Sequence, residues 1–320
     1  MFPRKYKKIS KFKRFLLKLL NVYAIDRESL NLVNPNYKND NGNNFILNDK
    51  SILLSNGYLP LDRKISNLDI FFRYAPNNKL WNSTERWKRI IPNINKEELI
   101  LTCFKSLIES IKKFHENNKL DITLNLISDV SNEKFDKKLI NNLDSNKINV
   151  KFISSKIKGN RGTYLECCDL AENSKDLIFF IEDDYLFEIN CFEEMVFTYS
   201  RLSTLFKNDI LLCPSDYPFY YDSSYNTSIY VGKNYRWRIV KETLLTFLMS
   251  KKNFDANRDK IRMVGEKENV PFEKPLHDIY KNTPCLAPIG SLSYHINRHI
   301  PAVTEDWSKI WKNNFNSIIK

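Results

Sequence analysis

The sequence predicts an α/β fold with a mainly parallel central sheet flanked by helices. Strand-like apolar runs alternate with amphipathic segments between residues 68 and 206, the pattern of parallel strands joined by crossover helices. One run, residues 177–181, consists of five large apolar residues in succession, as expected of a central strand buried on both faces. The chain has 320 residues, of which 42% are hydrophobic, so it can bury a core of this size.

The elements of the first half follow from local patterns. Asn95 with Glu98 three residues later is a helix-start pattern, and Asn190 with Glu193 repeats it. A run stopped by Pro76 fits a first strand that opens into a loop. Strands are expected at 68–73, 121–129, 147–154 and 177–181, and helices from Asn95 to Phe114, near 132–143, over 163–172 and from Asn190 to Leu202.

The second half predicts a smaller, mixed sheet. A strand at 210–213 ends at Pro214, and a helix is expected over 243–249. Aromatic residues accumulate between Phe219 and Trp237 with polar residues between them. They fit either an acceptor cleft that stacks on sugars or bases, or the core of the smaller sheet, and the pattern leaves both open.

Charge and cysteine usage limit the class of protein. The net charge of +12 is compatible with polyanionic partners: nucleic acid, an acidic membrane surface or diphosphate-bearing substrates. The 6 cysteines contain no CxxC pair, which favours a reduced, intracellular protein. No apolar run approaches the roughly 18 residues of a membrane span. We therefore expect a cytoplasmic protein.

Residues 1–25 combine a basic run with five large apolar residues between Phe15 and Leu20, which gives a short cationic amphipathic segment. It is too charged for the apolar region of a secretory signal. A membrane-surface helix at the inner face of the membrane is one interpretation, and a basic tail or a helix packed on the domain is the other.

Three acidic residues, Glu182, Asp183 and Asp184, directly follow the central strand. Ligands of open α/β sheets bind at the carboxyl ends of the strands, and carboxylates are the ligands of hard cations. The triplet therefore predicts a site for a cation and a phosphorylated substrate. The alternative is a solvated acidic turn after a core strand.

The order of elements, the Gly159-Asn160-Arg161-Gly162 turn and the Glu182-Asp183-Asp184 triplet resemble the GT-A fold glycosyltransferases of the broad family 2-like group. The resemblance covers roughly residues 66–300, and the triplet looks like the family's DxD-type signature. It implies a GT-A-like catalytic domain over 61–300, with a Rossmann-like nucleotide-sugar half at 66–206 and an acceptor half at 207–300. A basic segment and linker over 1–60 would precede the domain, and a C-terminal helix or tail over 301–320 would follow it.

The resemblance also implies a cofactor, Mn²⁺ or Mg²⁺, and a nucleotide pocket. Asp184 would touch the metal, and Asp183 would approach the metal or the ribose. Asp129, at the end of the second strand, would bind the nucleobase or ribose, with Arg73 and Tyr74 lining the same pocket.

Other residues are candidates for the same site. Arg161 could pair with a phosphate, although such a turn is often only a turn. His295 is a candidate third metal ligand by the family's pattern, against the alternative of a lone core or surface histidine. If it is a ligand, Asp184 and His295 must lie within reach of one cation.

The acceptor side needs a base and a binding surface. An inverting transferase needs a carboxylate that deprotonates the acceptor hydroxyl. By the family's pattern this is an acid at a helix start, where Asp278 stands here, and Asp216 is the second choice. Trp237, with Arg236 and Arg238, could form an acceptor wall, because an indole stacks on a sugar face and guanidinium groups bind anions.

The function that follows is metal-dependent transfer of a sugar from a nucleotide-diphosphate sugar to a glycan, lipid-linked or protein acceptor, with inversion. Nucleic acid is not an expected partner, and peripheral membrane association through the basic N-terminus is. Three alternatives remain open: a metal-dependent nucleotidyl or phosphoryl transferase, a glycoside hydrolase, and a non-enzymatic basic protein that binds membrane or nucleic acid.

Overall fold

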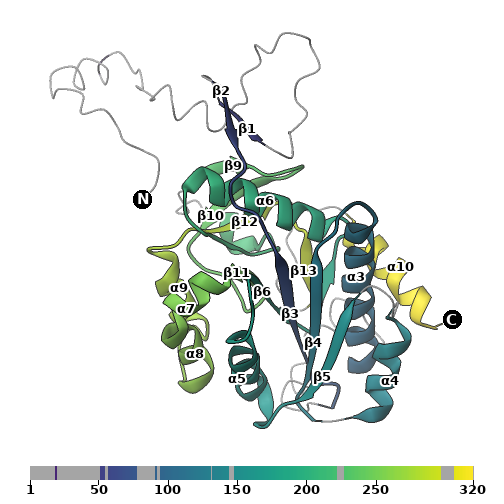
Figure 1. The fold of residues 1–320 in the computed structure, drawn as a ribbon. Helices are drawn as coiled ribbons and strands as arrows, with labels where there is room; N and C mark the ends of the chain where they lie inside the picture. The colour runs from purple at the N-terminus through teal and green to yellow at the C-terminus, as the bar shows by residue number, and fades with distance from the viewer. Residues whose placement is uncertain are drawn as a thin grey trace.

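A nine-stranded sheet forms the centre of the molecule, with helices packed on both of its faces (Figure 1). The structure is a computed structural model. It describes residues 19, 51–54, 57–77, 91, 94–130, 132–143, 148–221, 227–296 and 306–319. Apart from Leu19, the predicted amphipathic segment at 1–25 lies outside these residues.

The first half of the sheet is parallel, in the order β5-β4-β3-β6. β6 lies fully inside it, because the apolar side chains of residues 177–181 are all buried. Its neighbour β3 is likewise buried over most of its length. The elements of this half are β3 (Asn67–Tyr74), α3 (Lys96–Asn117), β4 (Asp121–Ser128), α4 (Glu133–Asn141), β5 (Asn149–Ser154), α5 (Gly159–Ala171) and β6 (Leu177–Glu182).

The second half continues the same sheet with mixed strand directions. β11 runs antiparallel to β6 and joins the two halves, and the order continues β11-β8-β12-β10-β9. These elements are α6 (Cys191–Phe206), β8 (Leu211–Leu212), the 3₁₀ turn η2 (Pro218–Tyr221), β9 (Ile229–Val231), β10 (Arg236–Val240), β11 (Phe247–Ser250), α7 (Lys251–Ala256), α8 (Arg258–Glu266), α9 (Lys274–Tyr280) and β12 (Cys285–Ile289).

The helix predicted over 243–249 is wrong. Its last three residues instead open the strand β11, which pairs with β6 on one side and β8 on the other. A short apolar run has no periodicity that separates a buried helix from a buried strand. The open hydrogen-bonding edges of the two neighbouring strands decide the outcome here.

Two small antiparallel sheets stand apart from the central one. β1 (Ser51–Leu54) pairs with β2 (Gly57–Pro60), and β7 (Tyr185–Phe187) pairs with β13 (Ser293–His295). The predicted fold class is confirmed: a large sheet with a parallel half, flanking helices and a smaller separate sheet. The strands predicted for the acceptor side belong to the main sheet.

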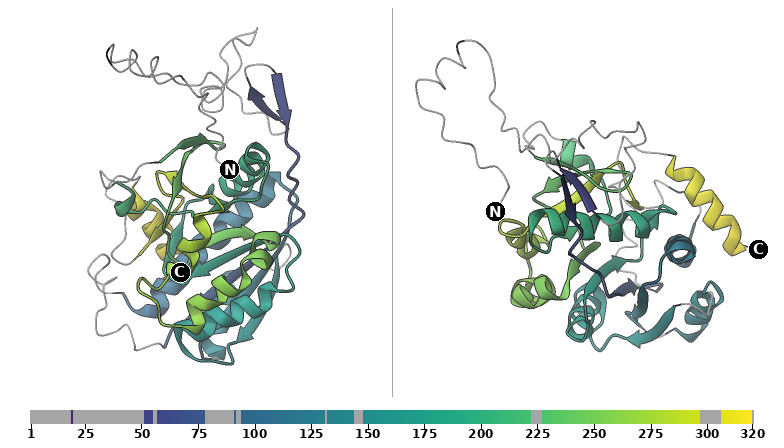
Figure 2. Two further views of the ribbon diagram at one scale, coloured as in Figure 1. Left: turned by 90° about the vertical axis from the view of Figure 1, so that its left-hand side faces the viewer. Right: turned by 45° about the horizontal axis from the view of Figure 1, so that its top comes forward.

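The helices form a layer on each face of the sheet. α3 and α6 pack together on one face, and α5 and α8 pack together on the other (Figure 2). The C-terminal helix α10 (Trp307–Ile319) lies along α3 (Figure 1). None of the helices in the described ranges is both long and apolar enough to cross a bilayer.

Local predictions at the helix ends are met in part. Asn95 and Glu98 form the predicted capping box at the start of α3. Asn190 is the N-cap of α6, but within the described residues its side chain makes no capping hydrogen bond. The 6 cysteines are buried and unpaired, as the sequence led us to expect.

Candidate active site

Three carboxylates meet three cationic partners at the carboxyl end of β6. Glu182 Oε1 accepts from Arg73 Nη2 at 2.9 Å, and Asp184 Oδ2 lies 3.1 Å from His295 Nε2. Both carboxylate oxygens of Asp183 accept hydrogen bonds. Oδ1 accepts from Lys96 Nζ at 2.7 Å. Its Oδ2 accepts from a backbone N–H at the end of β3.

Strand register brings these side chains together. β3 and β6 are parallel, with Arg73 beside Glu182 in the register. β7 and β13 are antiparallel, with His295 opposite Tyr185, and the two rings stack at 4.7 Å with an angle of 6° between their planes. The proximity of Asp184 and His295 expected from the sequence is confirmed, since the small sheet joins segments about a hundred residues apart.

Burial and charge act against each other at these groups. Burial opposes the ionisation of Asp184, but His295 and Lys96 outweigh it and lower the pKa of Asp184 to about 2. Burial raises the pKa of Glu182, and Arg73 offsets only part of that rise. Burial lowers the pKa of His295, but Asp184 raises it more, so the net shift is upward.

The donor atoms fit a cation that is shared with a substrate. One carboxylate and one imidazole converge at the Asp184–His295 pair. Mg²⁺ is commonly held by one or two carboxylates together with phosphate oxygens and water, so Asp184 supplies the oxygen ligand and His295 adds a nitrogen of the kind that transition metals accept. The carboxylate of Asp183 is engaged by Lys96 and a backbone N–H. Within the described part of the chain, no three His, Cys, Asp or Glu side chains form a ready-made metal cage.

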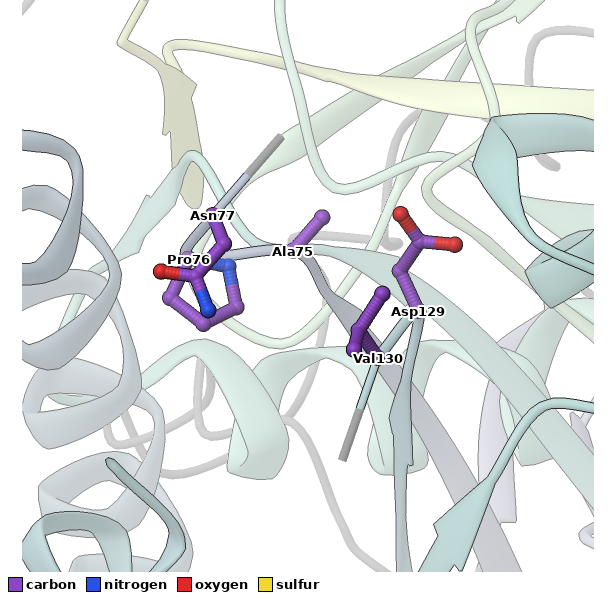
Figure 3. A pocket seen from close by; sticks show the side chains of 5 residues that line it. All are labelled: Ala75, Pro76, Asn77, Asp129 and Val130. Atoms are coloured by element: carbon purple, nitrogen blue, oxygen red, sulfur yellow. The ribbon is translucent and has the colours of Figure 1, made fainter. Parts of the chain in front are cut away.

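A small hollow lies where β3 and β4 end, beside the acidic cluster. Figure 3 shows the side chains that line it: Ala75, Pro76, Asn77, Asp129 and Val130. Its volume of about 30 Å³ suits one water molecule. Asp129 Oδ1 also accepts from the backbone N–H of Gly159 and thereby holds the start of α5. Its role toward a nucleobase or ribose stays a prediction.

Tyr74 and Arg161 do not reach this hollow with their side chains. The Tyr74 ring is buried, and its hydroxyl donates to Asp136 in α4 at 2.5 Å. Arg161 is exposed and donates from Nε to the carbonyl of Gly265 at 2.8 Å, which ties α5 to the end of α8. Tyr74 therefore does not line the hollow beside Asp129 as predicted, and Arg161 is engaged elsewhere.

Asp216 and Arg238 form a buried ion pair. This argues against Asp216 as the base and against Arg238 as part of an acceptor wall. Asp216 is fully buried and accepts from Tyr221 and from the backbone N–H of Gly290. Arg238 lies 3.4 Å from the same carboxylate and stacks on the Tyr221 ring. Burial raises the pKa of Asp216. Its carboxylate connects the ends of β8 and β12 and is closed to an acceptor hydroxyl.

Trp237 is fully buried, so the prediction of an indole wall for the acceptor is wrong. Its Nε1 donates to Glu194 Oε1 at 3.0 Å. Strand alternation places Arg236 on the other face of β10, where it is exposed. The alternative that the sequence left open, an aromatic core, holds for Trp237.

Asp278 does not stand at a helix start. It lies towards the end of α9, its side chain is 41% exposed, and it pairs with Lys281. The N-cap of that helix is Glu273. The charges of Glu182, His295 and Glu242 contribute to the pKa of its carboxyl group. Burial raises the pKa of Glu273 to about 7. Glu273 is thus the carboxylate at the expected structural position.

Neither Lys96 nor Glu273 was predicted from the sequence to lie near the acidic cluster. Glu273 could have been found, because Pro275 marks the first turn of a helix and places the start two residues before it. Nothing in the local pattern distinguishes Lys96 from other lysines. Its importance appears only when α3 is docked beside β6.

Comparisons with known proteins give matches at the level of fold. No family model and no curated protein matches the sequence. The matched structures include UDP-glucose pyrophosphorylase complexed with UDP-glucose (TM-score 0.42, 11% identity, 80% of this chain and 99% of that chain). They also include S. aureus TarS 1-349 (0.43, 9%, 71% and 60%). A third is galactosyltransferase LgtC with donor and acceptor sugar analogs (0.38, 12%, 79% and 96%). With TM-scores below 0.5 and identities of 9–12%, these similarities carry no conclusion about the activity of this chain.

Proposed function

We propose that the protein is a metal-dependent glycosyltransferase that moves a sugar from a nucleotide-diphosphate sugar to a hydroxyl of its acceptor, with inversion. The observation that carries this proposal is the Asp184–His295 pair, 3.1 Å apart at the carboxyl end of the central strand. That is where open α/β sheets bind nucleotides. The DxD-like triplet occupies the same place.

Different residues of the chain would bind the metal, bind the donor and hold the acidic cluster in position. Asp184 and His295 would hold Mn²⁺ or Mg²⁺, which when bound would offset the negative charge that develops on the leaving diphosphate. Because the pKa of Asp184 is about 2, this group is a carboxylate throughout the physiological range. The carboxylate of Asp129 would bind the nucleoside end of the donor, and Arg73 would hold Glu182 in place.

Glu273 is the proposed base. It would accept the proton of the acceptor hydroxyl as that oxygen attacks the sugar. A pKa near 7 suits this role, since a base should match the pH at which it works. The proposal replaces Asp278, which is paired with Lys281 at the surface.

The acceptor is proposed as a glycan, a lipid-linked sugar or a protein. Peripheral association with an anionic membrane through the basic residues of 1–25 would suit a lipid-linked acceptor, at the cytoplasmic face. Sedimentation of the full chain with anionic vesicles at low and high salt tests this point separately from catalysis.

The direct test is a thermal-shift screen with UDP-, GDP-, CMP- and dTDP-sugars, with and without Mn²⁺. Ligand at about 100 times its Kd stabilises the native state by about 2.7 kcal/mol, so a matching donor should raise the melting temperature by a few degrees. Asp184→Asn should lose the Mn²⁺-dependent part of the shift, and Asp278→Asn should keep it. If no nucleotide shifts the wild-type protein under either condition, the proposal is refuted.

Sugar transfer is then measured with the best donor. Release of nucleoside diphosphate that depends on an added acceptor supports the proposal. Formation of a nucleotide sugar from a nucleoside triphosphate and a sugar phosphate would instead identify a nucleotidyltransferase.

A further inference from the structure

Among the residues that the structure describes, Lys96 is the most solvent-accessible cation that pairs with the acidic end of β6. Its side chain is 23% exposed, compared with 4% for Arg73 and 10% for His295. Of the three described cations that pair with the triplet, it is therefore the one most exposed to an incoming anion.

The other two cations are held in place. Arg73 donates to the carbonyl and the side chain of Asn160 and to Glu182, and its guanidinium packs over the Tyr164 ring. His295 is stacked face to face on a buried aromatic ring. Lys96, by contrast, has a flexible four-carbon stem whose ammonium can move without any change in the backbone.

Lys96 also sits where helix physics opposes a cation. It is the first residue of α3, a helix of 22 residues, and the dipole of a helix disfavours positive charge at its N-terminus. The carboxylates of Asp183 and Asp184 compensate for this, since both act on the ammonium. The placement is thus explained by the acidic cluster and not by the helix.

We propose that Lys96 is a donor-binding residue whose ammonium leaves Asp183 and pairs with the diphosphate of the donor. The exchange frees Asp183 Oδ1 for a hydroxyl of the ligand, such as that of a ribose. Asp183 Oδ2 keeps its bond to the backbone N–H of Ala75, so the carboxylate stays in position. The inference rests on the proposed function and adds a protein cation to the metal.

A bound diphosphate increases the demand for positive charge at this site. Glu182, Asp183 and Asp184 carry negative charge, and a diphosphate adds at least two more charges of the same sign close by. An ammonium that moves from a carboxylate to phosphate oxygens offsets the new charge where it appears, and the hydrogen bonds it forms are charge-assisted. The carboxylate it leaves then receives a ligand hydroxyl.

The test compares Lys96→Met, which removes the charge at similar length, with Lys96→Arg, which keeps it. Lys105→Met is the matched control, because Lys105 lies on the same helix and pairs with Glu109 at 2.9 Å. Calorimetry in excess Mg²⁺ measures the binding of inorganic pyrophosphate and of UDP, GDP, CDP and dTDP. Unfolding curves confirm that each variant is folded.

We expect Lys96→Met to bind pyrophosphate and the preferred nucleoside diphosphate at least about tenfold more weakly, the loss of one charge-assisted hydrogen bond. Lys96→Arg should stay within about threefold of wild type, and Lys105→Met should not differ from it.

Each of the remaining outcomes would refute the role of Lys96, the proposed function, or both. If Lys96→Met binds both ligands as wild type does, the role of Lys96 is refuted and the transferase proposal stands. If Lys96→Arg is weakened as much as Lys96→Met, the position is structural and the inference also fails. If the wild type binds pyrophosphate through Lys96 but gains nothing from any nucleoside, only the nucleotide-sugar function fails. If the wild type binds neither ligand, both fail.

Discussion

Glu194 is a buried carboxylate in α6 that organises the turn between β9 and β10. It is fully buried and accepts from the backbone N–H groups of Lys233 and Asn234 at 2.9 and 2.7 Å. It also accepts from Trp237 Nε1 and from the hydroxyl of Thr198. One carboxylate therefore satisfies several donors that would otherwise be buried without partners.

Glu194→Ala should lower the free energy of unfolding by about 3–5 kcal/mol, because it leaves these buried donors unsatisfied. Urea unfolding at neutral pH measures the change. The neighbouring Glu193→Ala removes a half-exposed pair with Lys233 and should cost less than about 1 kcal/mol. Equal effects at the two positions would contradict the role assigned to Glu194.

Glu273 couples the candidate base to stability. Its pKa rises from the ordinary 4.5 to about 7, chiefly through burial, with Glu182 and Glu242 adding to the rise and His295 opposing it. The folded protein therefore keeps a proton that the unfolded chain releases between these two values. Stability from this group is present below about pH 4.5 and is lost as the pH rises through about 7.

Glu273→Gln should therefore gain stability relative to wild type as the pH rises from 4.5 to 7, with a constant difference above that. Urea unfolding at intervals across this range measures this difference in stability, and the exposed Glu268→Gln serves as control.

In a transfer assay, kcat/KM of the wild type should rise through about pH 7, and Glu273→Gln should lose most of the activity. An unchanged activity would exclude Glu273 as the base.

At the scale of elements, α10 supports the segment that carries His295. Trp311 is 5% exposed and belongs to a second apolar cluster, separate from the main core. The cluster includes Leu99 of α3 and the two neighbours of His295, Tyr294 and Ile296. The backbone N–H of Ile296 also donates to the carbonyl of Asp184 at 2.7 Å. The C-terminal helix thus reaches the site through packing.

Trp311→Ala should cost about 3–5 kcal/mol of stability, the usual range for a large buried aromatic side chain. We also expect faster hydrogen exchange in the peptide that contains β13, since its packing partner is lost. The exposed Lys312→Ala should change neither quantity. Normal exchange of β13 in the Trp311 variant would show that α10 is independent of the site.

At the scale of the whole molecule, the two halves predicted from the sequence share one sheet and one main core. β11 pairs with β6 of the first half and with β8 of the second. The main apolar cluster contains buried residues from both halves, from Leu68 to Leu292. A structural boundary between independent units near residue 207 is therefore not expected.

The protein should accordingly unfold in one cooperative transition. Far-UV and near-UV circular dichroism recorded against urea should give coincident curves with one midpoint. Two separate transitions would show that residues 66–206 and 207–300 fold as independent units.

Sequence patterns determined the features that depend on neighbours along the chain. The burial of residues 177–181, the capping box of Asn95 and the acidic triplet after the central strand follow from local composition and spacing. The expected closeness of Asp184 and His295 came from a family resemblance and is met by the geometry. These features place the acidic cluster at the carboxyl end of β6.

The tertiary structure alone decided which polar side chains reach that site. Asp216 and Trp237 look functional in sequence, yet packing between strands buries them, whereas docking of α3 brings Lys96 to Asp183. Residues 247–249 became a strand because two neighbouring strands offered open edges. The amino-acid sequence by itself therefore determined the class of fold and the position of the acidic cluster, since both depend on local periodicity and charge. The partners of each carboxylate were decided by contacts between residues far apart in the chain, which no local pattern specifies.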